Sequence, residues 1–115
     1  MKRKIIFKGK RVDNGEWVEG NYIFSKHSVI EDSHYILPFE NVTHIKVIPG
    51  TVCQYTGLKD KNGKMIFEGD KVLVGIKKMT VIFNNGCFYT PFDNSKYRLY
   101  GWKENTITVI GNIHD

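Results

Sequence analysis

Residues 47–74 read VIPGTVCQYTGLKDKNGKMIFEGDKVLV, and this stretch decides the fold class. Runs rich in β-branched and aromatic residues lie on either side of a polar segment, residues 58–64, that contains Asn62-Gly63. Asparagine and glycine both tolerate positive φ, and the carboxylate of Asp60 can accept hydrogen bonds from backbone amides later in the turn. The stretch therefore predicts two β-strands joined by a tight reversal.

A second reversal is predicted at residues 68–70, where a glycine again separates two strand-like runs. After it, Val72 and Val74 fall on one face of a strand, and Lys71 and Leu73 fall on the other. A Gly-Asp corner that leads into such a strand resembles the opening of small SH3-like barrels.

The two acidic residues of this corner also admit a catalytic interpretation. Glu68 and Asp70 are two residues apart, so on a strand they would point to one side and could serve as an acid and a base. A glycine between them instead favours a corner whose carboxylates accept backbone amide hydrogens. We therefore predict a structural turn motif, which comprises Gly57, Asn62, Gly63, Glu68, Gly69 and Asp70.

The composition fits a small folded β protein. The chain has 115 residues, of which 41% are hydrophobic and 13% aromatic, so it can bury a thin core in one domain or two small lobes. Lysine and arginine number 17 against 12 acidic residues, and the formal charge of +5 favours contact with polyanions without requiring it.

Further strand and turn signals lie on both sides of the central stretch. Asp13-Asn14-Gly15 predicts an N-terminal hairpin, and Asn84-Asn85-Gly86 predicts a second hairpin between strands at residues 79–83 and 87–90. Residues 42–48 and 106–110 are rich in β-branched residues and predict two more strands. No segment of about 15 residues has the apolar spacing of an amphipathic helix.

The predicted fold class is therefore mainly β with little helix. We expect a small SH3-like, partly open β-barrel with an additional N-terminal β-hairpin lobe. The lobe and the loop after it occupy residues 1–46, the barrel occupies residues 47–115, and the two are expected to form one compact unit.

Three regions of the chain resemble the YopX family of small phage and prophage proteins. The matching residues are 54–60 (QYTGLKD), 62–64 (NGK) and 67–70 (FEGD) in the centre, 7–11 and 15–20 near the N-terminus, and 110–113 near the C-terminus. Cys53 stands where the family usually has glycine, and Met65 stands where it often has an acidic residue. The resemblance implies a phage or prophage origin and no particular activity.

Several functional classes are disfavoured by the sequence. No apolar run approaches the roughly 20 residues of a membrane span, so no membrane contact is expected. Cys53 and Cys87 lie in apolar surroundings, which indicates reduced thiols and a cytoplasmic location in the bacterial host. The histidines and cysteines lack zinc-site spacing, no P-loop occurs, and a calcium loop through Gly63 would place Gly69 where a bidentate acid is needed. We predict a non-enzymatic protein without metal or cofactor.

The basic N-terminus has two interpretations. Lysine or arginine occupies six of the first eleven positions. These residues form either a phosphate-binding arm or the solvated side of an edge strand, where lysine discourages sheet-to-sheet aggregation. The edge-strand interpretation is the preferred one.

Two functional hypotheses remain. The preferred one is a protein-binding module that docks a host or phage protein through an aromatic-rich β surface. The alternative is a nucleic-acid binder, in which basic side chains contact phosphates while exposed aromatic rings stack on bases. The phosphate contacts would come from residues 2–11 or from Lys59, Lys61 and Lys64, and the stacking rings from Tyr55, Tyr97, Tyr100 or Trp102. Exposed strand edges also favour a homo-oligomer. The candidate interaction residues are Arg11, Tyr55, Lys59, Lys61, Lys64 and Trp102.

Overall fold

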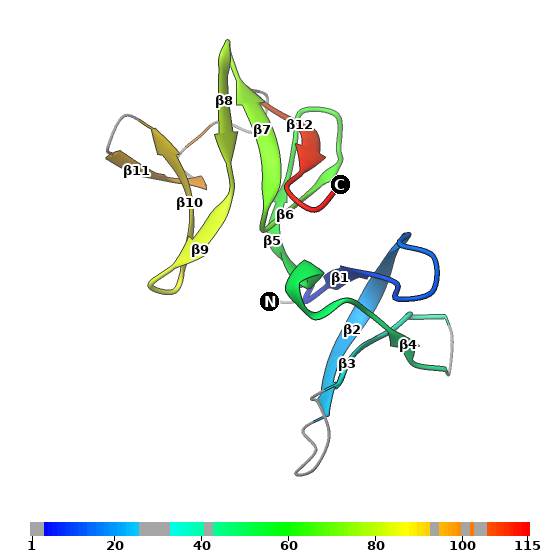
Figure 1. The fold of residues 1–115 in the computed structure, drawn as a ribbon. Helices are drawn as coiled ribbons and strands as arrows, with labels where there is room; N and C mark the ends of the chain where they lie inside the picture. The colour runs from blue at the N-terminus through cyan, green and yellow to red at the C-terminus, as the bar shows by residue number, and fades with distance from the viewer. Residues whose placement is uncertain (1–3, 26–32, 41–42, 93–94, 100–101, 103–105) are drawn as a thin grey trace. The chain divides into compact units, whose positions relative to one another are not determined.

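The computed structural model describes residues 4–25, 33–40, 43–92, 95–99, 102 and 106–115. Over these residues the protein is mainly β, with several antiparallel sheets and almost no helix, as predicted (Figure 1). The described strands close no barrel. The chain forms two compact units, which we call unit 1 (Met1–Gln54) and unit 2 (Tyr55–Asp115). In the part of the chain that is described, no helix is long and apolar enough to cross a membrane.

Unit 1 is an antiparallel sheet with the strand order β4-β3-β2-β1-β5. Its elements are β1 (Phe7–Lys10), β2 (Trp17–Ser25), β3 (Ser33–Leu37), β4 (Ile45–Lys46), the 3₁₀ helix η1 (Pro49–Thr51) and the first two residues of β5 (Cys53–Lys59). Cys53 and Gln54 of β5 lie opposite Lys8 and Phe7 of β1. Since β1 is thus paired on both sides, the edge-strand interpretation is wrong for Lys8 and Lys10, whereas Lys2 and Arg3 lie outside the described residues.

The predicted N-terminal hairpin is confirmed. β1 pairs with β2 from Phe7 opposite Gly20 to Lys10 opposite Trp17. In the turn, Gly15 adopts a φ of 73°, and the backbone amide of Glu16 donates to the side-chain oxygen of Asn14 at 2.9 Å. The reversal therefore uses the conformational freedom of glycine and the acceptor of asparagine.

Residues 45–48 lie between β3 and the end of β1. Ile45 and Lys46 pair with β3, whereas Val47 forms an antiparallel bridge with Arg11. The amide of Ile48 then donates to the carbonyl of Lys10 at 2.8 Å. The regular strand is only two residues long, shorter than the predicted residues 42–48, because the chain changes its pairing partner here.

Two backbone segments of unit 1 approach each other closely at Gly20. Ile36 and Val47 are its most deeply buried apolar side chains. The backbone of Leu37 and Pro38 passes so near Gly20 that a Cβ atom at that position would lie 2.1 Å from the Leu37 carbonyl oxygen. Only glycine, which has no Cβ, allows this approach.

Unit 2 contains two three-stranded antiparallel sheets, with the strand orders β12-β7-β8 and β11-β10-β9. Its strands, besides the rest of β5, are β6 (Met65–Phe67), β7 (Asp70–Val74), β8 (Lys77–Thr80), β9 (Ile82–Asn84), β10 (Cys87–Phe92), β11 (Ser95–Arg98) and β12 (Ile107–Asn112). The rest of β5 pairs with β6, with Tyr55 opposite Phe67 and a register shift before Lys59.

Two elements of unit 2 differ from the sequence prediction. The predicted strand at residues 79–83 is divided at Val81, whose carbonyl accepts the Gly69 amide (2.8 Å) and whose amide donates to the Asp70 carbonyl (2.9 Å). β8 also begins earlier than the predicted strand, since Lys77 and Lys78 belong to it and pair with β7. The two-residue turn begins with Gly75 at a φ of 63°, so β7 and β8 form a hairpin that the sequence prediction missed.

The second predicted hairpin is confirmed between β9 and β10. Cys87 lies opposite Asn84, and the turn between them consists of Asn85 and Gly86. Their φ angles are 50° and 79°, so both central positions are left-handed, as a type I′ turn requires.

The core of unit 2 lies on one face of the sheet β12-β7-β8. Val72 is fully buried and Lys71 is exposed, which confirms the alternation predicted for β7. The core residues are Ile66, Val72, Met79, Val81, Leu99 and Ile107. The opposite face of this sheet is left to solvent and carries lysines.

Candidate interaction surfaces

The polar turn at residues 60–64 is held by one carboxylate. Asp60 Oδ1 accepts the backbone amides of Asn62 and Lys64, each at 2.9 Å, so the predicted forward hydrogen bonding is confirmed. Asp60 Oδ2 accepts the backbone amide of Val109 in β12, also at 2.9 Å. The turn therefore satisfies part of the outer edge of β12, and its conformation is tied to the sheet.

Burial and hydrogen bonding oppose each other at Asp60. Burial raises the pKa of the carboxyl, because it disfavours the charged form. The three amide donors and the positive charge of Lys64 outweigh burial, and the pKa of Asp60 is lowered overall. The negative charge of the buried Asp60 carboxylate therefore stabilises hydrogen bonds from backbone amides of unit 2.

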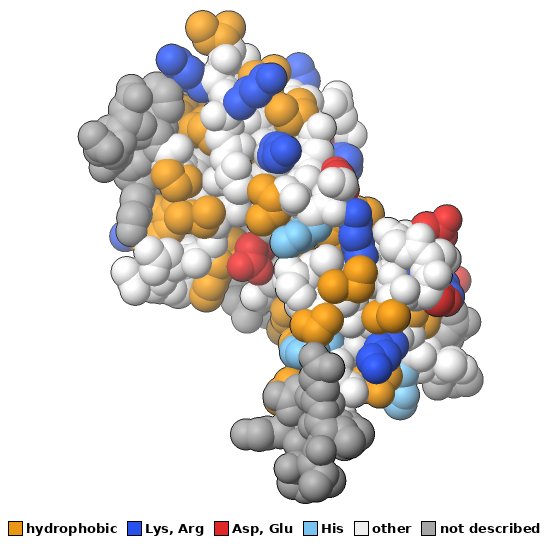
Figure 2. Space-filling view, in the orientation of Figure 1, with side chains coloured by type: hydrophobic (Ala, Val, Ile, Leu, Met, Phe, Trp, Pro, Cys, Tyr) orange, Lys and Arg blue, Asp and Glu red, His pale blue; other side chains and the backbone are white. Residues whose placement is uncertain are grey.

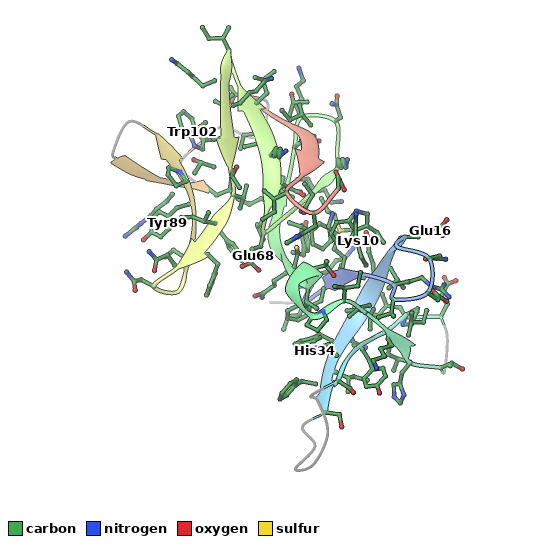
Figure 3. The ribbon with its side chains drawn as sticks, viewed as in Figure 1. Lys10, Glu16, His34, Glu68, Tyr89 and Trp102 are labelled. Atoms are coloured by element: carbon green, nitrogen blue, oxygen red, sulfur yellow. The ribbon has the colours of Figure 1, made fainter. Side chains whose placement is uncertain are left out.

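The corner at residues 68–70 is held in a similar way. Asp70 Oδ2 accepts the backbone amide of Phe67 (2.8 Å), and Oδ1 accepts the side-chain amide of Asn112 (2.9 Å). Asp70 is 1% exposed, and Gly69 takes a φ of 83° at the corner. The corner can be found in Figure 3 by the label of its first residue, Glu68. These contacts agree with the structural interpretation of the turn motif. Among the described residues, no three His, Cys, Asp or Glu side chains gather so that they could hold a metal ion.

The predicted surface residues of unit 2 separate into exposed lysines and buried aromatics. Lys59, Lys61 and Lys64 are exposed at the end of β5 and in the turn after it. Tyr55 is only 7% exposed, and its ring packs against Phe67 with 5.7 Å between centroids. The prediction that Tyr55 is exposed for stacking is therefore wrong, because its partner strand β6 turns it toward the interior.

Two further predicted residues already have partners within the chain. Trp102 is half-buried against the core of unit 2, and its indole N–H donates to the hydroxyl of Thr90 in β10 at 2.7 Å (Figure 3). Arg11, in unit 1, donates to both carboxylate oxygens of Asp13, at 2.9 and 2.8 Å. Tyr100 and the side chain of Tyr97 lie outside the described residues.

One face of unit 1 combines lysine with tryptophan. Lys8 and Lys10 point to the same side of β1, and their ammonium nitrogens lie 4.4 and 5.5 Å from the centroid of the Trp17 ring. Distances of this size are typical of cation–π contacts. We call these three residues the lysine–tryptophan face. Sequence reasoning singled out the lysines and missed Trp17, which the strand pairing of the structure places opposite Lys10.

A groove of about 350 Å³ lies on unit 2, on the face of the sheet β12-β7-β8 that points away from the core. We call it the lysine groove, and its lining residues are Lys71, Lys78, Met79, Thr80, Ile82, Pro91 and Ile110. Figure 2 shows lysine or arginine side chains among hydrophobic ones over β7 and β8. Sequence reasoning missed the groove because five strands contribute to it, and the outward position of Lys71 was the one signal available.

A β-bulge adds an apolar side chain to this groove. In the pairing of β12 with β7, Val109 lies opposite Val72, and Gly111 lies opposite Lys71. Ile110 is the extra residue between them, and it is 47% exposed beside Lys71. Bulges of this kind redirect a side chain at the edge of a sheet.

Comparisons with known proteins agree over nearly the whole chain. The family described as "YopX protein" matches residues 7–115. The crystal structure of protein EF1440 from Enterococcus faecalis is similar, with a TM-score of 0.60 and 22% sequence identity over 98% of this chain and 95% of that chain. This likeness concerns the fold alone. No curated protein matches the chain.

Proposed function

The chain belongs to the YopX family, and we propose that it is a non-catalytic protein-binding module encoded by a phage or prophage and active in the cytoplasm of the bacterial host. The observation that carries the proposal is the lysine groove, which joins two exposed lysines to apolar walls on a paired sheet. Apolar contact area rimmed by charge is typical of surfaces that dock proteins.

Exposed apolar side chains near the groove support the same function. Ile76, in the turn between β7 and β8, is 91% exposed, and Phe83 in β9 is 50% exposed. Large apolar side chains at such positions can act as anchors in a partner's surface. The acidic residues of the central motif offer less for chemistry, since Asp60 and Asp70 use their carboxylates to hold backbone amides.

Site-specific photo-crosslinking tests the proposal. A photoreactive phenylalanine derivative at Thr80, which lines the groove, should give a protein adduct in nuclease-treated extract from lysogenic host cells. The same group at Lys61, exposed in the same unit outside the groove, is the control. The expected adduct is specific to position 80, competed by excess unmodified protein, and reproduced with the purified partner. Absence of any such protein adduct would refute the proposal.

Nucleic-acid binding is the second candidate, favoured by the lysine–tryptophan face of unit 1. If this face binds single-stranded nucleic acid, affinity should fall with salt with a slope of roughly 0.7 per phosphate contact. Replacing both Lys8 and Lys10 by glutamine should lower that slope by about 1.4, which fluorescence anisotropy of a labelled oligonucleotide can measure. No binding at low salt would exclude this candidate.

Two structural expectations accompany the proposal. An SH3-like arrangement of the unit 2 strands is proposed from the Gly-Asp corner that leads into β7. Self-association through strand edges is proposed as well, and sedimentation over a range of concentrations tests it.

A further inference from the structure

On the outward face of the sheet β12-β7-β8, the side chains of β7 and β8 lie in cross-strand pairs. Lys71 in β7 lies opposite Thr80 in β8, and Leu73 lies opposite Lys78, so the two lysines are diagonal neighbours on one face. Diagonal side-chain positions on an antiparallel pair are about 7–8 Å apart. Within the part of the chain that the structure describes, neither ammonium group is paired with a carboxylate.

This diagonal spacing matches an extended ligand. Along a β-strand, side chains at positions i and i+2 point the same way and lie about 6.6–6.8 Å apart. Two carboxylates at alternate positions of an extended peptide could therefore meet Lys71 and Lys78 one to one. A compact dianion such as phosphate is too small to engage both lysines without bending their side chains toward each other.

The other walls of the groove determine what else the ligand carries. Ile110 reaches the groove through the β-bulge, and Ile82 and Pro91 come from the second sheet. Met79 of β8 also lines the groove, although it belongs to the buried core of unit 2. A ligand with charge alone would leave this apolar surface wet, so an apolar side chain beside the carboxylates gains by being buried there.

We propose that the lysine groove binds an extended acidic peptide segment that carries carboxylates at alternate positions and an apolar side chain next to them. The proposal rests on the proposed protein-binding function and names the chemistry of the partner. Charge complementarity selects this occupant, since the chain carries a formal charge of +5 and the groove offers two ammonium groups. Because the lysine ammonium group acts as a point charge, it can pair with aspartate or with glutamate.

Selection from a displayed library of random 12-residue peptides on the purified full chain tests the proposal. The expected peptides are enriched in Asp or Glu at positions i and i+2 and carry a neighbouring apolar residue. The matched variants are Lys71→Met with Lys78→Met, and Lys61→Met with Lys64→Met, which remove the same charge from the same unit inside and outside the groove. Selected peptides should lose about tenfold in affinity on the first double variant and less than about twofold on the second.

The outcomes separate this inference from the proposed function. Peptides without acidic enrichment, or acidic peptides that both double variants weaken equally, would overturn the acidic-ligand proposal while leaving a protein-binding module in place. A partner crosslinked at position 80 whose binding survives the loss of Lys71 and Lys78 would do the same. If neither peptides nor crosslinked proteins are recovered, the proposed function fails as well.

Discussion

Replacing Gly20 by alanine should destabilise unit 1 specifically. The added Cβ would lie 2.1 Å from the Leu37 carbonyl oxygen and 2.8 Å from the Pro38 Cα, whereas ordinary contacts begin at 3.4 Å. These are backbone atoms, held by the pairing of β2 with β3, where Asn21 lies opposite Leu37. The two strands must therefore separate by roughly 1 Å or more, because no flexible side chain can move out of the way.

The net effect on the free energy of unfolding can be worked out from two opposing contributions. Overpacking costs about 1–3 kcal/mol, and the upper end applies at Gly20 because the clash is with backbone. Alanine in place of glycine recovers about 0.5–1 kcal/mol by restricting the unfolded chain. The expected net loss is about 2 kcal/mol, which lowers the melting temperature of a unit of this size by roughly 10 °C.

Tryptophan fluorescence during urea unfolding measures this loss unit by unit. Unit 1 contains Trp17 and unit 2 contains Trp102, so Trp102→Phe leaves a reporter for unit 1 alone. Gly50→Ala is the matched control, because a Cβ at Gly50 in η1 would have no atom within 4 Å. That control should be neutral or slightly stabilising. An unchanged Trp17 transition in Gly20→Ala would refute the close approach described for unit 1.

The remaining predictions concern the two buried carboxylates of the central motif. Asp60→Asn should lower the free energy of unfolding by about 1–3 kcal/mol at neutral pH, because three backbone amides that donate to the carboxylate lose a charged acceptor. The folded state lowers the pKa of Asp60, so the Asp60 carboxylate stabilises the folded protein at pH values above its unfolded pKa of about 3.9. This stabilisation is lost as the pH falls through the folded pKa. Below about pH 4, the urea midpoint should therefore fall less steeply with pH in Asp60→Asn than in the wild type. Asp70→Asn should also cost about 1–3 kcal/mol, since its new amide group faces the donors of Phe67 or Asn112, and thermal unfolding followed by circular dichroism measures the loss. Wild-type stability in this second variant would contradict the bonding described for the corner.

Local chemistry was enough to predict several turns of this protein, although the turn at Gly75 between β7 and β8 was missed. Gly15 and the pair Asn85-Gly86 supply positive φ angles whatever surrounds them, so both hairpins could be predicted from a few adjacent residues. The forward bonds from Asp60 to Asn62 and Lys64 are equally local, spanning two and four residues. The alternation of apolar and polar residues in β7 likewise predicted which side chains, such as Val72, point inward.

Contacts between distant segments were beyond the reach of sequence patterns. The burial of Tyr55 depends on β6, and the division of a predicted strand at Val81 depends on its bonds to the corner at residues 69 and 70. The bulge at Ile110 depends on how β12 aligns with β7. Each of these follows from the registers of strands far apart in sequence, and a periodic pattern contains no information about register.

The sequence by itself therefore determined the β class, several of the places where the chain reverses, and the family. Only the tertiary structure decided which side chains meet, because strand pairing brings together residues that no local pattern links. The lysine groove shows the difference most clearly: Lys71 could be placed on an outward face from the alternation around it, but its diagonal neighbour Lys78 and the apolar wall at Ile110 exist only once β8 and β12 are aligned on either side of β7.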